Sequence, residues 1–145
     1  MKETAVIKVN NTAAIRQALS GNNLMDIAKA GSHVIQSNAR TYAPVDTGNL
    51  RASIQAEPDE QSAMVAWARI GTNVIYARIQ EFGGWIKPKT KKMLSWIGSD
   101  GKRVFAHAVH IPAQPYLRPA VDNHRNEIVS VVAAMVNTTI ERVAK

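Results

Sequence analysis

The sequence predicts an α+β fold, in which a small antiparallel sheet of about four strands packs against two long helices. Apolar residues recur every three or four positions in residues 24–42 and again in residues 121–143, which is the period of an amphipathic helix. In residues 50–57 apolar and polar side chains alternate, which is the period of a strand with one buried face. We therefore expect one long helix in the N-terminal half, another at the C-terminus, and the sheet between them.

The N-terminal region begins with a short β-prone run at residues 4–9. A brief helix capped at residues 11–12 should follow and end at Gly21, after which the asparagines at positions 22–23 can cap the long helix. Gly31 lies on the apolar stripe of that helix, where glycine costs about 1 kcal/mol relative to alanine. Close approach of a neighbouring backbone would compensate for that cost.

The long helix should end at Tyr42, because a stiff turn begins at Pro44 and proline disfavours helical geometry in the residue before it. Asp46 can accept hydrogen bonds from backbone amides two residues on, and Gly48 can adopt a positive φ at no steric cost. We therefore expect a helix-turn-strand corner at which Leu50 and Ile54 enter the core.

The polar residues 58–62 should form a turn, and residues 63–70 the returning antiparallel strand. Residues 74–82 are expected to form one or two helical turns, closed by Gly83 and Gly84. Three side chains in those turns are placed to pack inward: Tyr76, Ile79 and Phe82.

A second hairpin is predicted from residues 93–97 and 103–111, joined by the glycine-rich residues 98–101. Three prolines then punctuate the entry to the last helix, which should continue to Ala144 with two apolar stripes: Pro112, Pro115 and Pro119. Two adjacent stripes make a wide apolar surface on this helix, which predicts burial on two sides, against the sheet and against another helix or subunit. The tryptophans lie in or beside predicted strands and are expected to pack as core: Trp67, Trp85 and Trp96.

The residues do not assemble into a catalytic or metal-binding pattern, so we expect no enzyme, no cofactor and no metal. The chain has no cysteine, no phosphate-binding glycine loop and no nucleophile elbow. His107 and His110 are three apart in a predicted strand, so they should point to opposite faces. The acids are scattered over turns and helix starts: Asp46, Glu57, Glu81, Asp100 and Asp122. No run of about 18 apolar residues is present, so no membrane association is expected.

The chain is basic, with 18 Lys and Arg against 11 Asp and Glu, for a net charge of +7. Much of the excess lies in the second hairpin, against Asp100 alone: Lys87, Lys89, Lys91, Lys92, Lys102 and Arg103. This pattern is typical of a solvated hairpin face, and it is also compatible with contact to DNA or to an acidic protein surface.

Residues 43–54, which include the sequence Pro-Val-Asp-Thr-Gly-Asn-Leu-Arg, resemble the tailed-bacteriophage minor tail component or tail completion (neck) family. Two further segments agree in order and spacing: residues 76–83, with Tyr-Ala followed by Glu-Phe-Gly, and residues 111–120, with a proline-aromatic-leucine entry to the last helix. The motif residues are Pro44, Asp46, Thr47, Gly48, Leu50, Tyr76, Glu81, Phe82, Gly83, Pro112, Pro115, Tyr116 and Leu117. The resemblance spans roughly residues 12–135.

The resemblance implies a single tail-completion-like domain over residues 1–145. Such a protein is structural: it completes the tail of a phage or prophage at the neck, between head connector and tail tube, as a ring that is expected to be hexameric. The implied partners are other copies of the chain, the tail terminator or tail tube protein, the head-side connector protein, and DNA passing through the channel. It would be made in the bacterial host cytoplasm and reside in the virion tail or neck.

Two questions stay open at this level. Glu81 either pairs within the chain with an arginine such as Arg51 or Arg69, or forms a salt bridge across a subunit interface. The alternative function is a basic nucleic-acid-binding protein that grips phosphate with the hairpin of residues 87–103.

Overall fold

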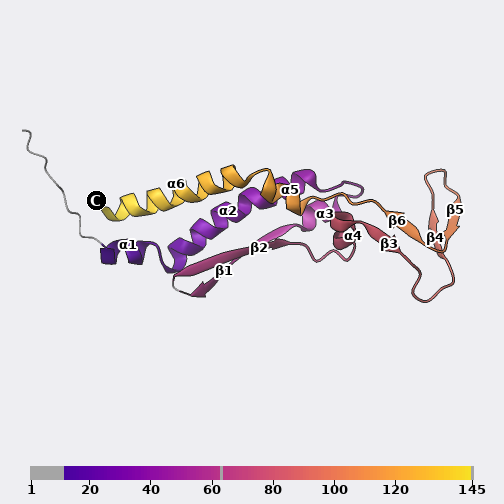
Figure 1. Cartoon of the computed structure of the whole chain (residues 1–145), viewed down its shortest axis with the longest axis horizontal. Helices are drawn as coiled ribbons and strands as arrows, with labels where there is room; N and C mark the ends of the chain where they lie inside the picture. Colours follow the sequence, from indigo (N-terminus) through magenta and orange to yellow (C-terminus); the bar gives the residue numbers. More distant parts are fainter. Residues whose placement is uncertain (1–11, 63, 145) are drawn as a thin grey trace, which may run out of the picture. The chain divides into compact units, whose positions relative to one another are not determined.

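The computed structural model describes residues 12–62 and 64–144, and it confirms the α+β class. The helices are α1 (Thr12–Ala18), α2 (Gly21–Tyr42), α3 (Asn49–Ser53), α4 (Ala77–Phe82), α5 (Leu117–Asp122) and α6 (Arg125–Ala144) (Figure 1). The strands are β1 (Gln55–Ser62), β2 (Val65–Gly71), β3 (Gly84–Ile86), β4 (Leu94–Ile97), β5 (Arg103–Ala106) and β6 (Val109–Ile111). The expected strand at residues 4–9 lies outside the described residues.

The described strands form three two-stranded sheets instead of one four-stranded sheet: β1 with β2, β3 with β6, and β4 with β5. Contacts divide the chain into two compact units, of which the first comprises Met1–Ile35, Ala56–Ile70 and His124–Lys145. The second comprises Gln36–Gln55 and Gly71–Asn123. A grouping by contacts does not test whether the units unfold together, so the single domain over residues 1–145 stays a prediction.

In the first unit, α2 and α6 pack closely at Gly31, as its place on the apolar stripe predicts. A Cβ atom at this position would lie 3.0 Å from Val132 Cγ2 and 3.8 Å from Ile128 Cγ2. The neighbour is thus a pair of side chains of α6, where a backbone was expected. Both apolar stripes of α6 are half-buried in part: Ile128, Val132 and Met135 on one, and Val136 and Ile140 on the other, where Val129 is 61% exposed.

The long helix α2 ends at Tyr42 as predicted, but its beginning differs from the prediction. Gly21 was expected to end the preceding helix, with an asparagine at 22–23 as the cap. Instead Gly21, at φ +54°, is the first residue of α2 itself. Glycine tolerates this backbone conformation without a steric cost, so the chain turns directly from α1 into α2.

The corner after α2 contains a helix where a strand was predicted. Gly48 has φ +79° as expected, but residues 49–53 form α3 and the strand begins only at Gln55. Leu50 and Ile54 are four residues apart, a spacing that suits one face of a helical turn as well as alternate positions of a strand. Both are buried as predicted, with 3% and 0% of their surface exposed.

The end of α3 is held by polar side chains of α2. Gln36 donates from Nε2 to the Ile54 carbonyl oxygen at 3.0 Å, and Arg40 donates to the same oxygen from Nη2 at 2.8 Å and from Nε at 3.2 Å. This carbonyl follows the last turn of α3, where no intrahelical donor is available. The chain therefore leaves the corner at a fixed position on α2.

The turn predicted at residues 58–62 is wrong, because β1 continues through Pro58 to Ser62. Both strands of a two-stranded sheet are edge strands, and an edge strand tolerates a proline because one row of its amides needs no partner. The returning strand is confirmed, as β2.

The second predicted hairpin is confirmed for β4 and β5, which pair antiparallel from Leu94↔Ala106 to Ile97↔Arg103. The single strand expected at residues 103–111 is instead split, because β6 pairs with β3 in the register Ile86↔Val109. Residues 87–93 lie between β3 and β4, whereas only residues 107 and 108 separate β5 from β6. Seven residues cannot pair one to one with two, so residues 87–93 form a bulge opposite residues 107 and 108. We call residues 84–111 the β-ribbon.

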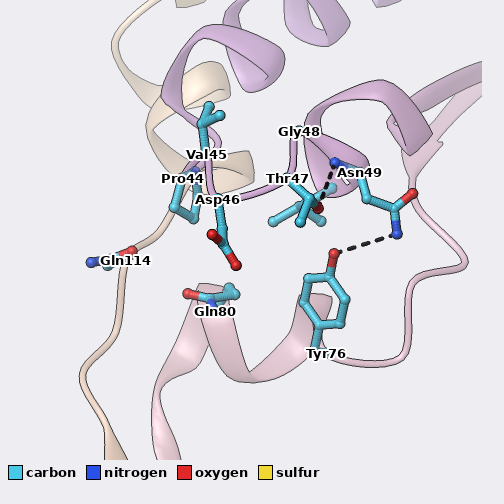
Figure 2. A pocket seen from close by; sticks show the side chains of 10 residues that line it. Pro44, Val45, Asp46, Thr47, Gly48, Asn49, Tyr76, Gln80 and Gln114 are labelled. Atoms are coloured by element: carbon cyan, nitrogen blue, oxygen red, sulfur yellow. Dashed lines mark hydrogen bonds between the residues drawn. The ribbon is translucent and has the colours of Figure 1, made fainter. Parts of the chain in front are cut away.

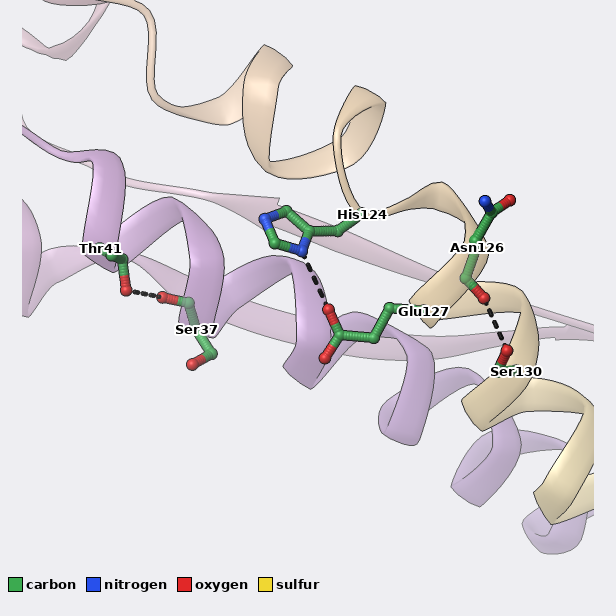
Figure 3. Close-up of polar contacts among 6 residues, drawn as sticks. All are labelled: Ser37, Thr41, His124, Asn126, Glu127 and Ser130. Atoms are coloured by element: carbon green, nitrogen blue, oxygen red, sulfur yellow. Dashed lines mark hydrogen bonds and ion pairs between the residues drawn. The ribbon is translucent and has the colours of Figure 1, made fainter.

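The last helix, expected to be continuous, is broken at residues 123–124 into α5 and α6. At the start of α6, His124 Nδ1 lies 2.9 Å from Glu127 Oε2 (Figure 3), and the amide of Ile128 donates to the His124 carbonyl. An acid in the first turn of a helix is favourable because the amides there are unpaired. This local pairing marks a new helix start, which apolar periodicity alone does not reveal.

Gly83, which closes α4 as predicted, provides a test of the fold. It has φ +67°, and a Cβ atom there would lie 2.7 Å from the Ala113 nitrogen and 3.0 Å from the Ile111 oxygen. Gly101 has a similar φ of +76° but has open space around it. Gly101→Ala should lower the free energy of unfolding by about 1 kcal/mol through backbone strain alone. Gly83→Ala should lower it by about 3 kcal/mol or more, because backbone atoms must also move.

Urea denaturation of the two variants measures this difference. Equal losses in the two variants would show that the close approach of residues 111–113 to Gly83 is absent in solution.

Candidate functional site

The three family motifs come together in the second unit, around α4. A pocket of about 400 Å³ is lined by residues 44–50, by Tyr76 and Gln80 of the second motif region, and by Gln114 of the third (Figure 2). The motif residues Pro44, Asp46, Thr47, Gly48, Leu50 and Tyr76 are all among its lining. Segments far apart in the sequence therefore share one site.

Two kinds of hydrogen bond join these motifs. Asn49 Nδ2 donates to the Tyr76 hydroxyl at 3.5 Å, which is a long contact between the first motif and the start of α4. The backbone amide of Gln114 donates to the Gln80 carbonyl oxygen at 2.7 Å, which fastens the third motif to α4. The amide of Asn49 donates to Thr47 Oγ1 at 3.4 Å, so a turn bond expected for Asp46 is made by its neighbour.

The pocket has little catalytic potential. Asp46 is the only acid among its lining residues, and in Figure 2 its carboxylate points toward Gln80. The lining contains no histidine or lysine that could act as a base beside a nucleophile. The polar groups of the pocket are instead suited to binding a partner or to stabilising the turn at residues 44–50.

Glu81 is the most strongly engaged motif residue, and within the chain it binds backbone amides instead of the expected arginine Arg51 or Arg69. Its carboxylate accepts hydrogen bonds from the backbone amides of Tyr116 at 2.7 Å, Leu117 at 2.9 Å and Arg118 at 3.0 Å. These amides open α5 and have no intrahelical partner. Glu81 therefore caps α5 from α4 in place of a pair with Arg51 or Arg69, whereas a bridge to another subunit stays a prediction.

The environment of Glu81 sets its charge. Burial by itself raises the pKa of this carboxyl, since only 8% of the residue is exposed. The three backbone hydrogen bonds, together with the charge of Arg118, outweigh burial and hold the pKa below its usual range. Burial raises the pKa of the Tyr116 hydroxyl, and the charge of Glu81 adds to that effect. At neutral pH the site thus contains an anionic carboxylate beside a neutral phenol.

Two of the three side chains expected to pack inward from residues 74–82 are exposed: Tyr76 at 39% and Phe82 at 64%. The third, Ile79, is half-buried, and the buried pair is Ala77 and Glu81. Ala77 and Glu81 are four residues apart and share one helical face, and the bonds of Glu81 to α5 turn that face inward. Ile75, just before α4, is 98% exposed.

A second pocket of about 350 Å³ adjoins Glu81. It is lined by Gly71, Thr72, Ala77, Arg78, Glu81, Phe82, Tyr116, Leu117 and Arg118. The hydroxyls of Thr72 and Ser53 lie 2.6 Å apart, and the Val74 amide donates to Thr72 Oγ1 at 3.1 Å. Ser53 thus ties α3 to the loop before α4, which is a structural role.

The basic residues of the second hairpin lie apart from this pocket, in the β-ribbon. Four belong to its bulge and two to the turn end of the β4–β5 pair, and all are exposed: Lys87, Lys89, Lys91, Lys92, Lys102 and Arg103. His107 Nδ1 lies 3.3 Å from the Lys92 carbonyl oxygen, and the His110 ring lies 5.0 Å from that of Trp85. Among the described residues there is no group of three potential metal ligands.

The tryptophans were expected to be core residues, but all three are exposed. Trp85 is 65% exposed, Trp96 is 42% exposed, and Trp67 is 37% exposed with the Arg69 guanidinium 5.1 Å from its ring centroid. Two-stranded sheets provide too little cover to bury such side chains. The strands that hold Trp67 and Trp96 were predicted correctly, whereas β3, which holds Trp85, was not predicted as a strand.

Sequence reasoning missed Gln36 and Arg40, which hold the corner through the Ile54 carbonyl. They lie one helical turn apart on α2, and Ala39 beside Arg40 is fully buried. A glutamine on a buried helical face needs a hydrogen-bond partner, and that requirement was the available signal.

Residues 16–83 match a family model described as "Bacteriophage HK97-gp10, putative tail-component". This match confirms the resemblance to a phage tail-component family that was recognised from the motifs. It covers the corner after α2 and the whole of α4 through Gly83, whereas the third motif lies beyond it. Neither the curated proteins nor the solved structures yielded a match.

The tail-component match supports a structural, tail-related role and a place in the virion. The family is one of structural tail components and is not a known class of enzymes. Among the described residues, no helix is both long and apolar enough to cross a lipid bilayer.

The Glu81 cap predicts a specific dependence of stability on pH. Because the folded-state pKa is lowered, the carboxylate stabilises the fold above the unfolded pKa of about 4.3, and this contribution disappears as pH falls through the folded pKa. Glu81→Gln should lower the free energy of unfolding by about 2–3 kcal/mol at pH 7, because an amide group cannot accept all three bonds. The gap between variant and wild type should narrow below about pH 4.

Urea denaturation between pH 3 and pH 7 measures that gap. His124→Ala, which removes the exposed pair with Glu127, serves as a control and should change stability by less than about 1 kcal/mol. A gap for Glu81→Gln that stays constant over this range would contradict a charged cap.

Proposed function

We propose that this protein completes a phage tail at the neck, between the head connector and the tail tube. The family match over residues 16–83 is the observation that carries the proposal, because the matched residues include α2, the corner and α4. The resemblance of residues 111–120 to the family's entry to the last helix extends the same assignment toward the C-terminus.

The way the chain uses its polar groups supports an assembly role. Gln36, Arg40 and Glu81 are the polar side chains that hold the second unit, and each of them binds backbone atoms. None of them faces a nucleophile or a metal ligand set among the described residues. The buried polar chemistry thus maintains shape, as expected of a structural component.

Exposed apolar side chains support the same role. Ile75 is 98% exposed, Phe82 is 64% exposed and Val45 is 56% exposed, all in or beside the family motifs. Exposed apolar side chains that form a contiguous patch are typical of surfaces that other proteins cover. In the proposed assembly these surfaces meet other copies of the chain, in a ring expected to be hexameric, and the tail terminator or tail tube protein and the head-side connector protein. The protein would be made in the bacterial host cytoplasm.

Deletion of the gene from the phage or prophage that encodes the chain tests the proposal. Electron microscopy of the lysate should show DNA-filled heads and separate tails, and wild-type protein supplied from a plasmid should restore joined particles. The variant Ile75→Asp should fail to restore joined particles, because it places a charge on the proposed contact surface. It should still fold, since Ile75 is 98% exposed and contributes little to folding. Completed tails joined to DNA-filled heads in the deletion lysate would refute the proposal.

A second candidate function, nucleic-acid binding, is favoured by one observation. The β-ribbon carries six basic residues against Asp100, for a net charge of +5. If the ribbon grips phosphate, duplex DNA should bind and its affinity should fall by about a hundredfold or more between 50 and 200 mM salt. A titration at these two salt concentrations measures the effect, and absent or salt-insensitive binding would remove this candidate.

A further inference from the structure

Two pockets of the second unit share helix α4 and differ in charge. The pocket of about 400 Å³, which we call the Asp46 pocket, has one acid, Asp46, and no lysine, arginine or histidine among its lining residues. The pocket of about 350 Å³, which we call the Arg78 pocket, is lined by two arginines, Arg78 and Arg118. Its one lining acid, Glu81, is already bound to three backbone amides. One pocket therefore offers a carboxylate, and the other offers guanidinium groups.

These charged groups are available to a partner. Asp46, Arg78 and Arg118 are all exposed, and none of them forms an ion pair with another residue in the described ranges 12–62 and 64–144. In Figure 2 the Asp46 carboxylate points toward Gln80, whose amide group carries no charge. A cation from a second molecule can therefore approach Asp46 without displacing one that is already bound there.

The two pockets use opposite sides of α4. Gln80 lines the Asp46 pocket, whereas Arg78 and Phe82 line the Arg78 pocket. With 3.6 residues per turn, Gln80 lies about 160° around the helix axis from both Arg78 and Phe82, since each is two residues away. A subunit with complementary groups on opposite sides can bind a second copy head to tail.

Each pocket also exposes an apolar side chain beside its charged group. Val45 lines the Asp46 pocket and is 56% exposed, and Phe82 lines the Arg78 pocket and is 64% exposed. Arginine and aromatic residues are enriched at protein–protein interfaces, where apolar contact accompanies the polar one. The composition of the Arg78 pocket is therefore typical of a surface that another protein covers.

We propose that the Asp46 carboxylate of one copy binds the guanidinium groups of Arg78 and Arg118 of a second copy. The two oxygens of a carboxylate can accept hydrogen bonds from two guanidinium groups, which are strong because both partners are charged. A pair of copies then keeps one unused Asp46 pocket and one unused Arg78 pocket, so repetition closes a ring or extends a chain of subunits. This inference rests on the proposed function, because it names the contact that would build the ring.

Charge reversal in purified full-length protein tests the contact. Asp46→Arg and Arg78→Glu each place like charges opposite each other, whereas Arg118 stays unchanged because its charge supports the cap of α5. The matched controls are Asp26→Arg and Lys29→Glu, which reverse exposed charges of α2 in the first unit. Self-association is measured by sedimentation velocity and light scattering at low salt over a range of protein concentrations.

Wild-type protein and both controls should self-associate equally, and Asp46→Arg and Arg78→Glu should each do so at least about tenfold more weakly. Asp46→Asn, which preserves the size of the side chain and its suitability for a turn, should also weaken association. Circular dichroism verifies that each variant retains its fold.

An equimolar mixture of Asp46→Arg and Arg78→Glu should form pairs of subunits again. In the mixture, the intact Asp46 pocket of one variant meets the intact Arg78 pocket of the other, which neither variant can achieve alone. This recovery separates a direct contact from a general loss of stability.

Three outcomes would overturn the inference: a wild-type protein that stays monomeric at every concentration, an Asp46→Arg variant that associates like wild type, or a mixture that fails to form pairs. A loss of duplex DNA binding in Arg78→Glu without a change in self-association would likewise assign Arg78 to nucleic acid. These results concern the contact alone. Joined virions in the deletion lysate would instead refute the proposed function, so the two failures are distinguishable.

Discussion

The second unit depends on the carboxylate of Glu81. A buried carboxylate is unfavourable unless it is fully hydrogen-bonded, and here the amides of Tyr116, Leu117 and Arg118 provide three donors. The interaction spans 35 residues of sequence at its shortest and places the start of α5 on α4. The amide of Gln114, bound to the Gln80 carbonyl, fastens the preceding residues to the same helix. Helix α4 is therefore the element on which the motifs converge.

The same principle holds the corner after α2. There a backbone carbonyl, that of Ile54, receives three hydrogen bonds from Gln36 and Arg40, whereas at α5 a side chain receives three from the backbone. In both places a polar side chain fixes a segment end that has no regular backbone partner. The interior is thus tightly specified, while large apolar side chains such as Ile75 remain at the surface. That combination is typical of a subunit shaped for assembly.

The parts of the fold that were predicted correctly depend on local rules. Helix α2 up to Tyr42, the β4–β5 hairpin, the positive φ angle at Gly48 and the end of α4 at Gly83 follow from periodicity and turn chemistry within a few residues. The errors arose where one local pattern admits two structures. Leu50 and Ile54 suit a helical turn and a strand equally, and a proline in a polar run suits either a turn or an edge strand.

The sequence by itself determined the resemblance to a phage tail-component family, most of the helical and extended segments, and the residues that carry the motifs, because each of these is encoded in short-range order along the chain. Only the tertiary structure decided what Glu81 binds, which strand pairs with β3, and which face of α4 is buried. These contacts join residues distant in sequence, and a carboxylate has the same local pattern whether it faces an arginine or three amides. Its partner is set by the path of the chain, which brings α5 to α4.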